Sequence, residues 1–119
     1  MLEPMVWNNL FNLQANDPKL EWQPFRTGVD ILPLYRNEQT ECFCALLRYQ
    51  ANAVIPEHEH IGVEHLLILQ GSQQDERGSY PAGTLLINPP ATSHSVQSPE
   101  GCIVLAIWEK PVRFNSSEP

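Results

Sequence analysis

The sequence predicts a single all-β domain, built as a small sandwich or barrel. Short apolar segments recur along the 119 residues, separated by glycine, proline and asparagine. About eight short strands with turns at such close spacing are typical of sandwiches and barrels. No segment has the sustained periodicity of a long helix, and no apolar run approaches the roughly 20 residues of a membrane span. A chain of this length is expected to form one domain with its own core.

The barrel is expected at residues 22–112, between an N-terminal arm at residues 1–21 and a frayed tail at residues 113–119. The arm has some apolar spacing in MVWNNLFNL, which predicts one helical turn or a segment lying across the barrel. Large aromatic residues near this end are expected to cover the domain's own core: Trp7, Phe11 and Trp22. A dimer contact through a swapped arm is the alternative.

The first strands lie on either side of a polar turn. Residues 21–28 predict an irregular segment, and residues 29–35 predict a short strand. Pro33 favours an edge position for this strand because proline lacks the N–H that a sheet ladder needs. Residues 40–49, TECFCALLRY, predict a strong strand with two distinct faces. Asn52 is expected in the following turn, because asparagine tolerates a left-handed conformation.

The second half of the chain repeats this pattern of strand and turn. A polar hairpin is expected after Gly71, with Gly78 at its tip and a second turn ending at Gly83. Asn88-Pro89-Pro90 predicts a stiff loop, because proline fixes the backbone. The remaining strands are expected at residues 54–60, 66–69, 84–87, from 94 to 96, and 102–108.

Charge and cysteine content restrict the partners. Fourteen acidic and seven basic residues give a net charge of −7. A surface of this sign repels phosphate backbones, so nucleic acid is not an expected partner. A membrane is not expected either, because no apolar run is long enough to span it. The odd number of cysteines argues against a disulfide framework, and the N-terminus does not read as a signal peptide, so a cytoplasmic location is expected. Cys42, Cys44 and Cys102 are expected in the core, with a redox or second-metal role for Cys42-x-Cys44 as the alternative.

Candidate metal ligands gather in the stretch PEHEHIGVEHLLILQG. Side chains two positions apart on a strand share a face, so His58 and His60 point one way, roughly 7 Å apart at their Cα atoms. A bend at Gly62 lets the chain return and present Glu64 to the same point. His94, in NPPATSH, is the other histidine with a setting that suits a fourth ligand. Imidazole and carboxylate together are ligands of zinc and related divalent metals.

Simpler interpretations exist for these residues. The two histidines of HEH could belong to a solvated polar strand, and Glu64 could pair with an arginine. Metal binding is favoured because all the candidates fall in register. His65 faces away from Glu64 on a regular strand, so it is expected to support the site or an interface and not to bind the metal.

This sequence resembles the cupins, small jelly-roll barrels with a metal in the mouth. Their first motif is matched by His58-x-His60, three residues, Glu64, six residues and Gly71, with Asn52 in place of the leading glycine. The resemblance implies a cupin-type double-stranded β-helix, which is a jelly-roll barrel. It also implies that the two histidines and the glutamate bind the metal.

The second cupin motif is also present, with departures from the family pattern. Gly83, five residues, Pro89-x-Ala91, two residues and His94 follow it, with alanine in place of a glycine and Ser98 in place of an asparagine. The phrases ALLRYQANAVIPEHEHIGVEHLLILQG and DERGSYPAGT resemble the cupin domains of ChrR-type anti-sigma factors and their single-domain relatives. The likeness covers roughly residues 22–108. Nothing in this sequence resembles the sigma-binding zinc domain of that family.

The resemblance implies a metal-binding sensor or regulatory module without the sigma-binding domain, with zinc as the expected metal and iron, nickel or manganese as alternatives. The alternative function is a small metal-dependent enzyme, such as a dioxygenase that cleaves dicarbonyl compounds, and it predicts an apolar cavity lined by Phe43, Leu47 or Trp108. A third alternative is a barrel in which metal only stabilises the fold. The expected partners are a second copy of the chain, forming a homodimer, and a small-molecule ligand in the barrel.

Overall fold

The computed structural model describes residues 3–114, and nearly all of the regular structure within them is strand. A single 3-10 turn, η1 (Leu10–Asn12), precedes the strands. No helix in this part of the chain is long and apolar enough to cross a membrane. The strands are β1 (Gln23–Arg26), β2 (Val29–Arg36), β3 (Phe43–Tyr49), β4 (Ala53–Glu59), β5 (Glu64–Asp75), β6 (Gly78–Pro81), β7 (Leu85–Asn88), β8 (Ser93–Ser98), β9 (Cys102–Trp108) and β10 (Arg113–Phe114).

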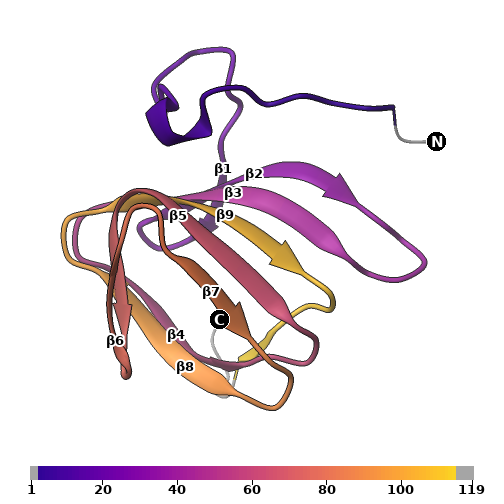
Figure 1. Ribbon diagram of the computed structural model, residues 1–119, viewed down its shortest axis with the longest axis vertical. Helices are drawn as coiled ribbons and strands as arrows, with labels where there is room; N and C mark the ends of the chain where they lie inside the picture. The colour runs from indigo at the N-terminus through magenta and orange to yellow at the C-terminus, as the bar shows by residue number, and fades with distance from the viewer. Residues whose placement is uncertain (1–2, 115–119) are drawn as a thin grey trace.

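The strands form one antiparallel sheet that curls into two facing layers (Figure 1). One layer runs β1-β2-β3-β9-β5, with β7 on the other side of β5, and the second contains β6, β8, β4 and β10. β5 belongs to both layers, because its first half pairs with β9 and its last residues pair with β6 and β8. The predicted all-β fold is therefore confirmed.

The main core lies between the two layers. Alternate residues of β3 point inward, so Ala45, Leu47 and Tyr49 join the interior, while Leu46 and Arg48 point outward. Leu46 is nevertheless fully buried, because a second apolar cluster covers the outer face of the layer. Burying both faces of this layer requires a segment outside the barrel.

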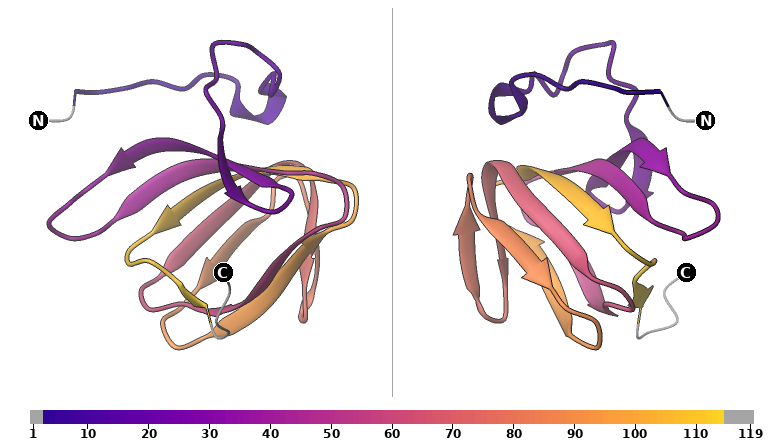
Figure 2. Two further views of the ribbon diagram at one scale, coloured as in Figure 1. Left: turned by 180° about the vertical axis from the view of Figure 1, so that it is seen from behind. Right: turned by 45° about the vertical axis from the view of Figure 1, so that its right-hand side comes forward.

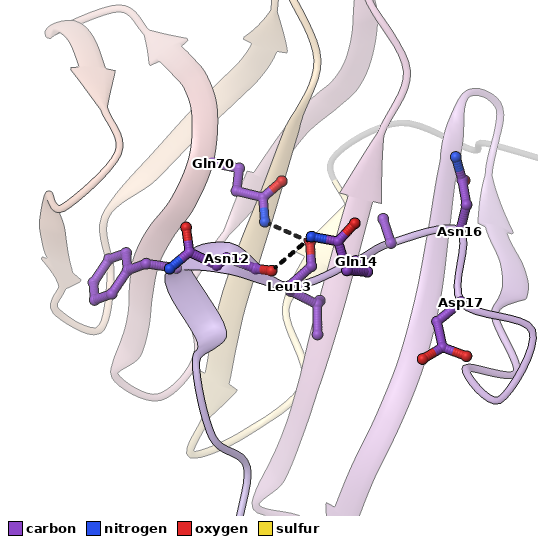
Figure 3. Close-up of a pocket in the computed structure, with 8 residues that line it drawn as sticks. Asn12, Leu13, Gln14, Asn16, Asp17 and Gln70 are labelled. Atoms are coloured by element: carbon purple, nitrogen blue, oxygen red, sulfur yellow. Dashed lines mark hydrogen bonds between the residues drawn. The ribbon is translucent and has the colours of Figure 1, made fainter.

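The N-terminal arm supplies that cover (Figure 2). Leu10, Leu13 and Trp22 pack against the outer cluster. Gln70 Nε2 donates to the Leu13 carbonyl oxygen over 2.8 Å and fixes the arm to β5 (Figure 3). The predicted core contact is confirmed for Trp22. It is wrong for Phe11 and Trp7, whose side chains are exposed.

Most predicted strands are present, with differences at the edges of the sheet. The segment expected to be irregular contains β1, which pairs with β2 only as far as Ile31. Pro33 therefore borders β3 alone, consistent with its predicted edge position. The hairpin pairs Asp75 with Gly78, so the two residues between them form its tip and not Gly78. Of the expected tail, residues 113–114 form β10 against β4, and residues 115–119 lie outside the described part.

Candidate metal centre

Four side chains from three segments converge inside the barrel. His58 lies on β4, His60 directly follows it, Glu64 begins β5, and His94 lies on β8. One ligand atom from each lies within 4.8 Å of all the others, and all four residues are buried. The structure thus brings together the whole set of residues that the sequence predicted.

Backbone contacts hold these segments in place. His58 on β4 pairs with His94 on β8, so their side chains share the inner face. The His60 N–H donates to the Thr92 carbonyl oxygen over 2.8 Å, which joins the end of β4 to the start of β8. Gly62 follows at a close approach, where a Cβ atom would lie 2.7 Å from Glu109 Cβ. This bend returns the chain to Glu64, as the spacing predicted.

Each histidine donates its Nδ1–H to a fixed oxygen. His58 Nδ1 lies 2.9 Å from the Pro56 carbonyl oxygen, and His60 Nδ1 lies 2.9 Å from the Thr92 carbonyl oxygen. His94 Nδ1 lies 2.9 Å from Asp75 Oδ2. Because these oxygens only accept, each Nδ1 carries the proton and each Nε2 is left with a lone pair. The hydrogen bonds therefore assign all three rings the tautomer that binds metal through Nε2.

The Nε2 lone pairs of two histidines lie close to a carboxylate oxygen, which is also an acceptor. His60 Nε2 lies 2.9 Å and His94 Nε2 lies 3.8 Å from Glu64 Oε1, yet neither nitrogen has a hydrogen-bond partner. Two acceptors this close and buried repel each other unless a cation, either a proton or a metal ion, lies between them. This buried cluster of three imidazoles and one carboxylate suggests a divalent metal.

The protonation states suit metal binding. Burial raises the pKa of Glu64, but contact with His60 and the N–H of Trp108 outweigh burial and leave the pKa below its ordinary value. The carboxylate is held at both oxygens, by Asn88 over 2.9 Å and by Trp108 Nε1 over 2.6 Å. Burial lowers the pKa of His58, which keeps that ring neutral. An ionised carboxylate and a neutral imidazole are the forms that bind metal.

Asp75 supports the site but was not predicted from the sequence. Its side chain is 3% exposed, and it accepts the Nδ1–H of His94. Its other oxygen accepts from the Tyr80 hydroxyl and the Arg77 backbone N–H, each over 2.8 Å. For the segment DERGSY, which supplies these groups, the sequence predicts only a hairpin and a resemblance to the family. The close spacing of Asp75, Arg77 and Tyr80 in this hairpin was the sequence feature that could have indicated a buried carboxylate.

Replacing Asp75 with asparagine is expected to weaken metal binding by about 10–100-fold, the range typical of carboxylates that orient ligating histidines. The amide carries no negative charge and can present an N–H to His94 in place of an acceptor oxygen. Competition titration with a chromophoric chelator measures the change. Tyr80→Phe, which keeps the carboxylate, is the matched control and should lose much less. Equal affinities for Asp75→Asn and the unaltered protein would contradict this role.

The other candidates lie away from the cluster. His65 is half-buried and pairs with Ile87 and Ile107 in the layer, so it does not join the four ligand candidates. Cys44 and Cys102 are buried, as expected, and Cys42 is only partly so. All three cysteines are free thiols.

Two hollows that share part of their lining lie near the site. The inner one, about 30 Å³, borders His58, Glu64 and His94. The outer one, about 220 Å³, does not border the ligand candidates and is lined by residues of β1, β2, β3, β9 and β10 and of the segment before β10; we call it the mouth pocket. Both are walled by Trp108, and the predicted liners Leu47 and Phe43 belong to the inner and outer hollow respectively.

A family model described as the ChrR cupin-like domain matches residues 12–113. The chain belongs to this family. A curated relative, the anti-sigma-E factor ChrR of Cereibacter sphaeroides, is 36% identical over 81 residues. That match covers 66% of this chain but 38% of ChrR, so the chain spans well under half the length of this relative.

Solved structures confirm the cupin fold. The Rhodobacter sphaeroides complex of SigE with the anti-sigma ChrR matches with a TM-score of 0.67 and 24% identity, covering 90% of this chain and 70% of that one. An acetylacetone dioxygenase from Acinetobacter johnsonii matches with a TM-score of 0.79 and 16% identity, covering 98% and 80%. At these identities the structural matches establish the shared fold and not a shared activity.

Proposed function

We propose that this chain is a zinc-binding sensor or regulatory module, with His58, His60, Glu64 and His94 as the ligands. The observation that carries the proposal is the set of imidazole lone pairs turned toward one buried carboxylate. Four protein ligands are the number that a closed, tetrahedral zinc site requires. Membership of the ChrR cupin-like family is consistent with a regulatory role.

The proposal also covers the domain bounds, the location and the oligomeric state of the protein. We place the barrel at residues 22–112, extended by the two residues of β10. We place the protein in the cytoplasm, where free thiols such as those of its three cysteines persist. We also propose a homodimer, because the exposed Trp7 and Phe11 on the arm offer an apolar contact to a second copy. Inhibition of a sigma factor is not included, since the match to ChrR covers only 38% of that protein.

Elemental analysis of protein purified without added metal tests the central proposal. Zinc at close to one atom per chain would support it. Iron at that level would favour the second candidate function, and protein that takes up none of these metals even when they are supplied would refute the metal site.

The second candidate is a metal-dependent oxygenase, favoured by the apolar hollows beside the site. The shared fold with an acetylacetone dioxygenase makes β-dicarbonyl compounds the first substrates to try. Iron held by these side chains would supply redox chemistry next to the hollow. Oxygen uptake by the iron-loaded protein with such a compound, absent with zinc, would establish this function. Unfolding by chelators with no activity of either kind would indicate a purely structural metal.

Metal release is expected as the pH falls below the usual histidine range, because burial holds the pKa of His58 under its ordinary value. Protons then compete for the Nε2 lone pairs, and with three histidine ligands the affinity should fall by up to about a thousandfold per pH unit below that range. Zinc release at a series of pH values, followed with a chromophoric chelator, measures this. Retention unchanged down to pH 4 would argue against these ligands.

A further inference from the structure

The mouth pocket collects positive charge on an otherwise acidic protein. Of the seven basic residues in the chain, four either line this pocket or adjoin a residue that does. They are Arg26, Arg36, Lys110 and Arg113. Against a net charge of −7, this end of the barrel is the place where a small anion is most favoured.

Two of these cations are not neutralised. Arg113 pairs with Glu59, and Lys110 lies near Glu41. The side chains of Arg26 and Arg36, in contrast, form no ion pair or hydrogen bond with any residue between 3 and 114. Among the described residues, no acidic group therefore competes with a ligand for these two charges.

Both free guanidinium groups lie over aromatic rings. The Cζ atom of Arg26 is 3.5 Å from the centre of the Phe114 ring, and that of Arg36 is 4.1 Å from the centre of the Phe43 ring. Stacking uses the flat face of the group and leaves its N–H edges open. Those edges have the geometry that binds a carboxylate through two hydrogen bonds.

Behind these charges the pocket is apolar and small. Apart from Arg36, its walls are aromatic rings, a proline and a valine: Phe25, Phe43, Trp108, Pro111, Val112 and Phe114. Its volume of about 220 Å³ is below the range of roughly 300–1,000 Å³ for drug-sized ligands. It therefore suits one ring or a short acyl chain.

We propose that the mouth pocket binds a small apolar carboxylate, with the carboxylate on Arg36, attracted also by the charge of Arg26 on Phe114, and the apolar body on Phe43 and Trp108. This inference deepens the proposed function, because it names the class of ligand that the sensor barrel takes. It depends on the mouth pocket itself and not on which metal, if any, is bound deeper in the barrel.

Isothermal titration calorimetry with octanoate tests the proposal on the full chain, both as purified and after treatment with EDTA. Octanamide serves as the uncharged probe of the same shape. Octanoate is expected to bind at least tenfold more tightly than octanamide, because only the acid engages the free guanidinium groups. Arg36→Gln keeps much of the side chain without its charge and is expected to weaken octanoate binding by about tenfold.

Lys19→Gln is the matched control, since it removes one positive charge from the exposed arm, and it should leave octanoate binding unchanged. Equal binding of octanoate and octanamide, or an Arg36→Gln variant that binds octanoate normally, would overturn the proposal. A circular dichroism spectrum of each variant confirms that it is folded; Arg26→Gln gives a second variant if Arg36→Gln is not. If elemental analysis finds no zinc, the proposed zinc site fails, but octanoate binding by the purified protein is still expected.

Discussion

Replacing Gly71 with alanine is expected to destabilise the barrel by more than about 3 kcal/mol, a large part of the 5–15 kcal/mol typical of a folded domain. Gly71 has a φ of 73°, which costs roughly 1–2 kcal/mol for a residue with a Cβ atom. That Cβ would lie 2.0 Å from the carbonyl oxygen of Gly101. The overlap is with backbone, so no side chain can move aside, and the passage of β5 from one layer to the other has to distort.

Urea denaturation followed by circular dichroism measures this loss. Gly83→Ala is the matched control, because Gly83 has a φ of 92° but open space around the added Cβ atom. That variant carries the conformational cost alone and should lose about 1–2 kcal/mol. If the two variants unfold at the same urea concentration, close packing between β5 and the turn at Gly101 is not a major source of stability.

Replacing His60 with alanine is expected to lower zinc affinity more than about a hundredfold, beyond the range expected for a residue that only orients a ligand. His60 is fully buried, and its Nε2 is the histidine nitrogen closer to Glu64, at 2.9 Å. Its removal leaves three ligands and a vacated volume that the surrounding strands cannot refill without moving. The site would then be both incomplete and less rigid.

Zinc content after dialysis and competition with a chromophoric chelator measure this effect. His65→Ala is the control, because it removes a nearby imidazole outside the cluster of ligand candidates. That variant should keep its zinc. A His60→Ala protein with stoichiometric zinc and an affinity within tenfold of the unaltered protein would show that the ion, if bound, sits elsewhere.

The sequence was most informative where local periodicity decides the outcome. The alternation of a strand places His58 and His60 on one face, and Gly62 provides the bend before Glu64, so their convergence follows from spacing alone. The left-handed Asn52, with a φ of 68°, was predictable from its residue type. The jelly-roll class of barrel, in contrast, followed from the resemblance to the cupins.

Features that depend on distant pairing were missed. β10 forms because Arg113 and Phe114 pair with residues 58–59 on β4, far away in the sequence. β1 exists because Gln23 and its neighbours meet β2, although Pro24 makes the segment look irregular. Asp75 reaches His94 only because β5 curls into the second layer. None of these contacts leaves a periodic signature in its own segment.

The hydrogen-bond acceptors that orient the three imidazoles differ in how easily a substitution can remove them. His58 and His60 lean on carbonyl oxygens of the main chain, and a side-chain replacement at Pro56 or Thr92 still leaves a carbonyl at each position. The orientation of His94 depends instead on a side chain, the carboxylate of Asp75, which a single substitution can remove. Among the three histidines, natural or engineered variation can therefore loosen His94 through a substitution at Asp75 without changing a ligand.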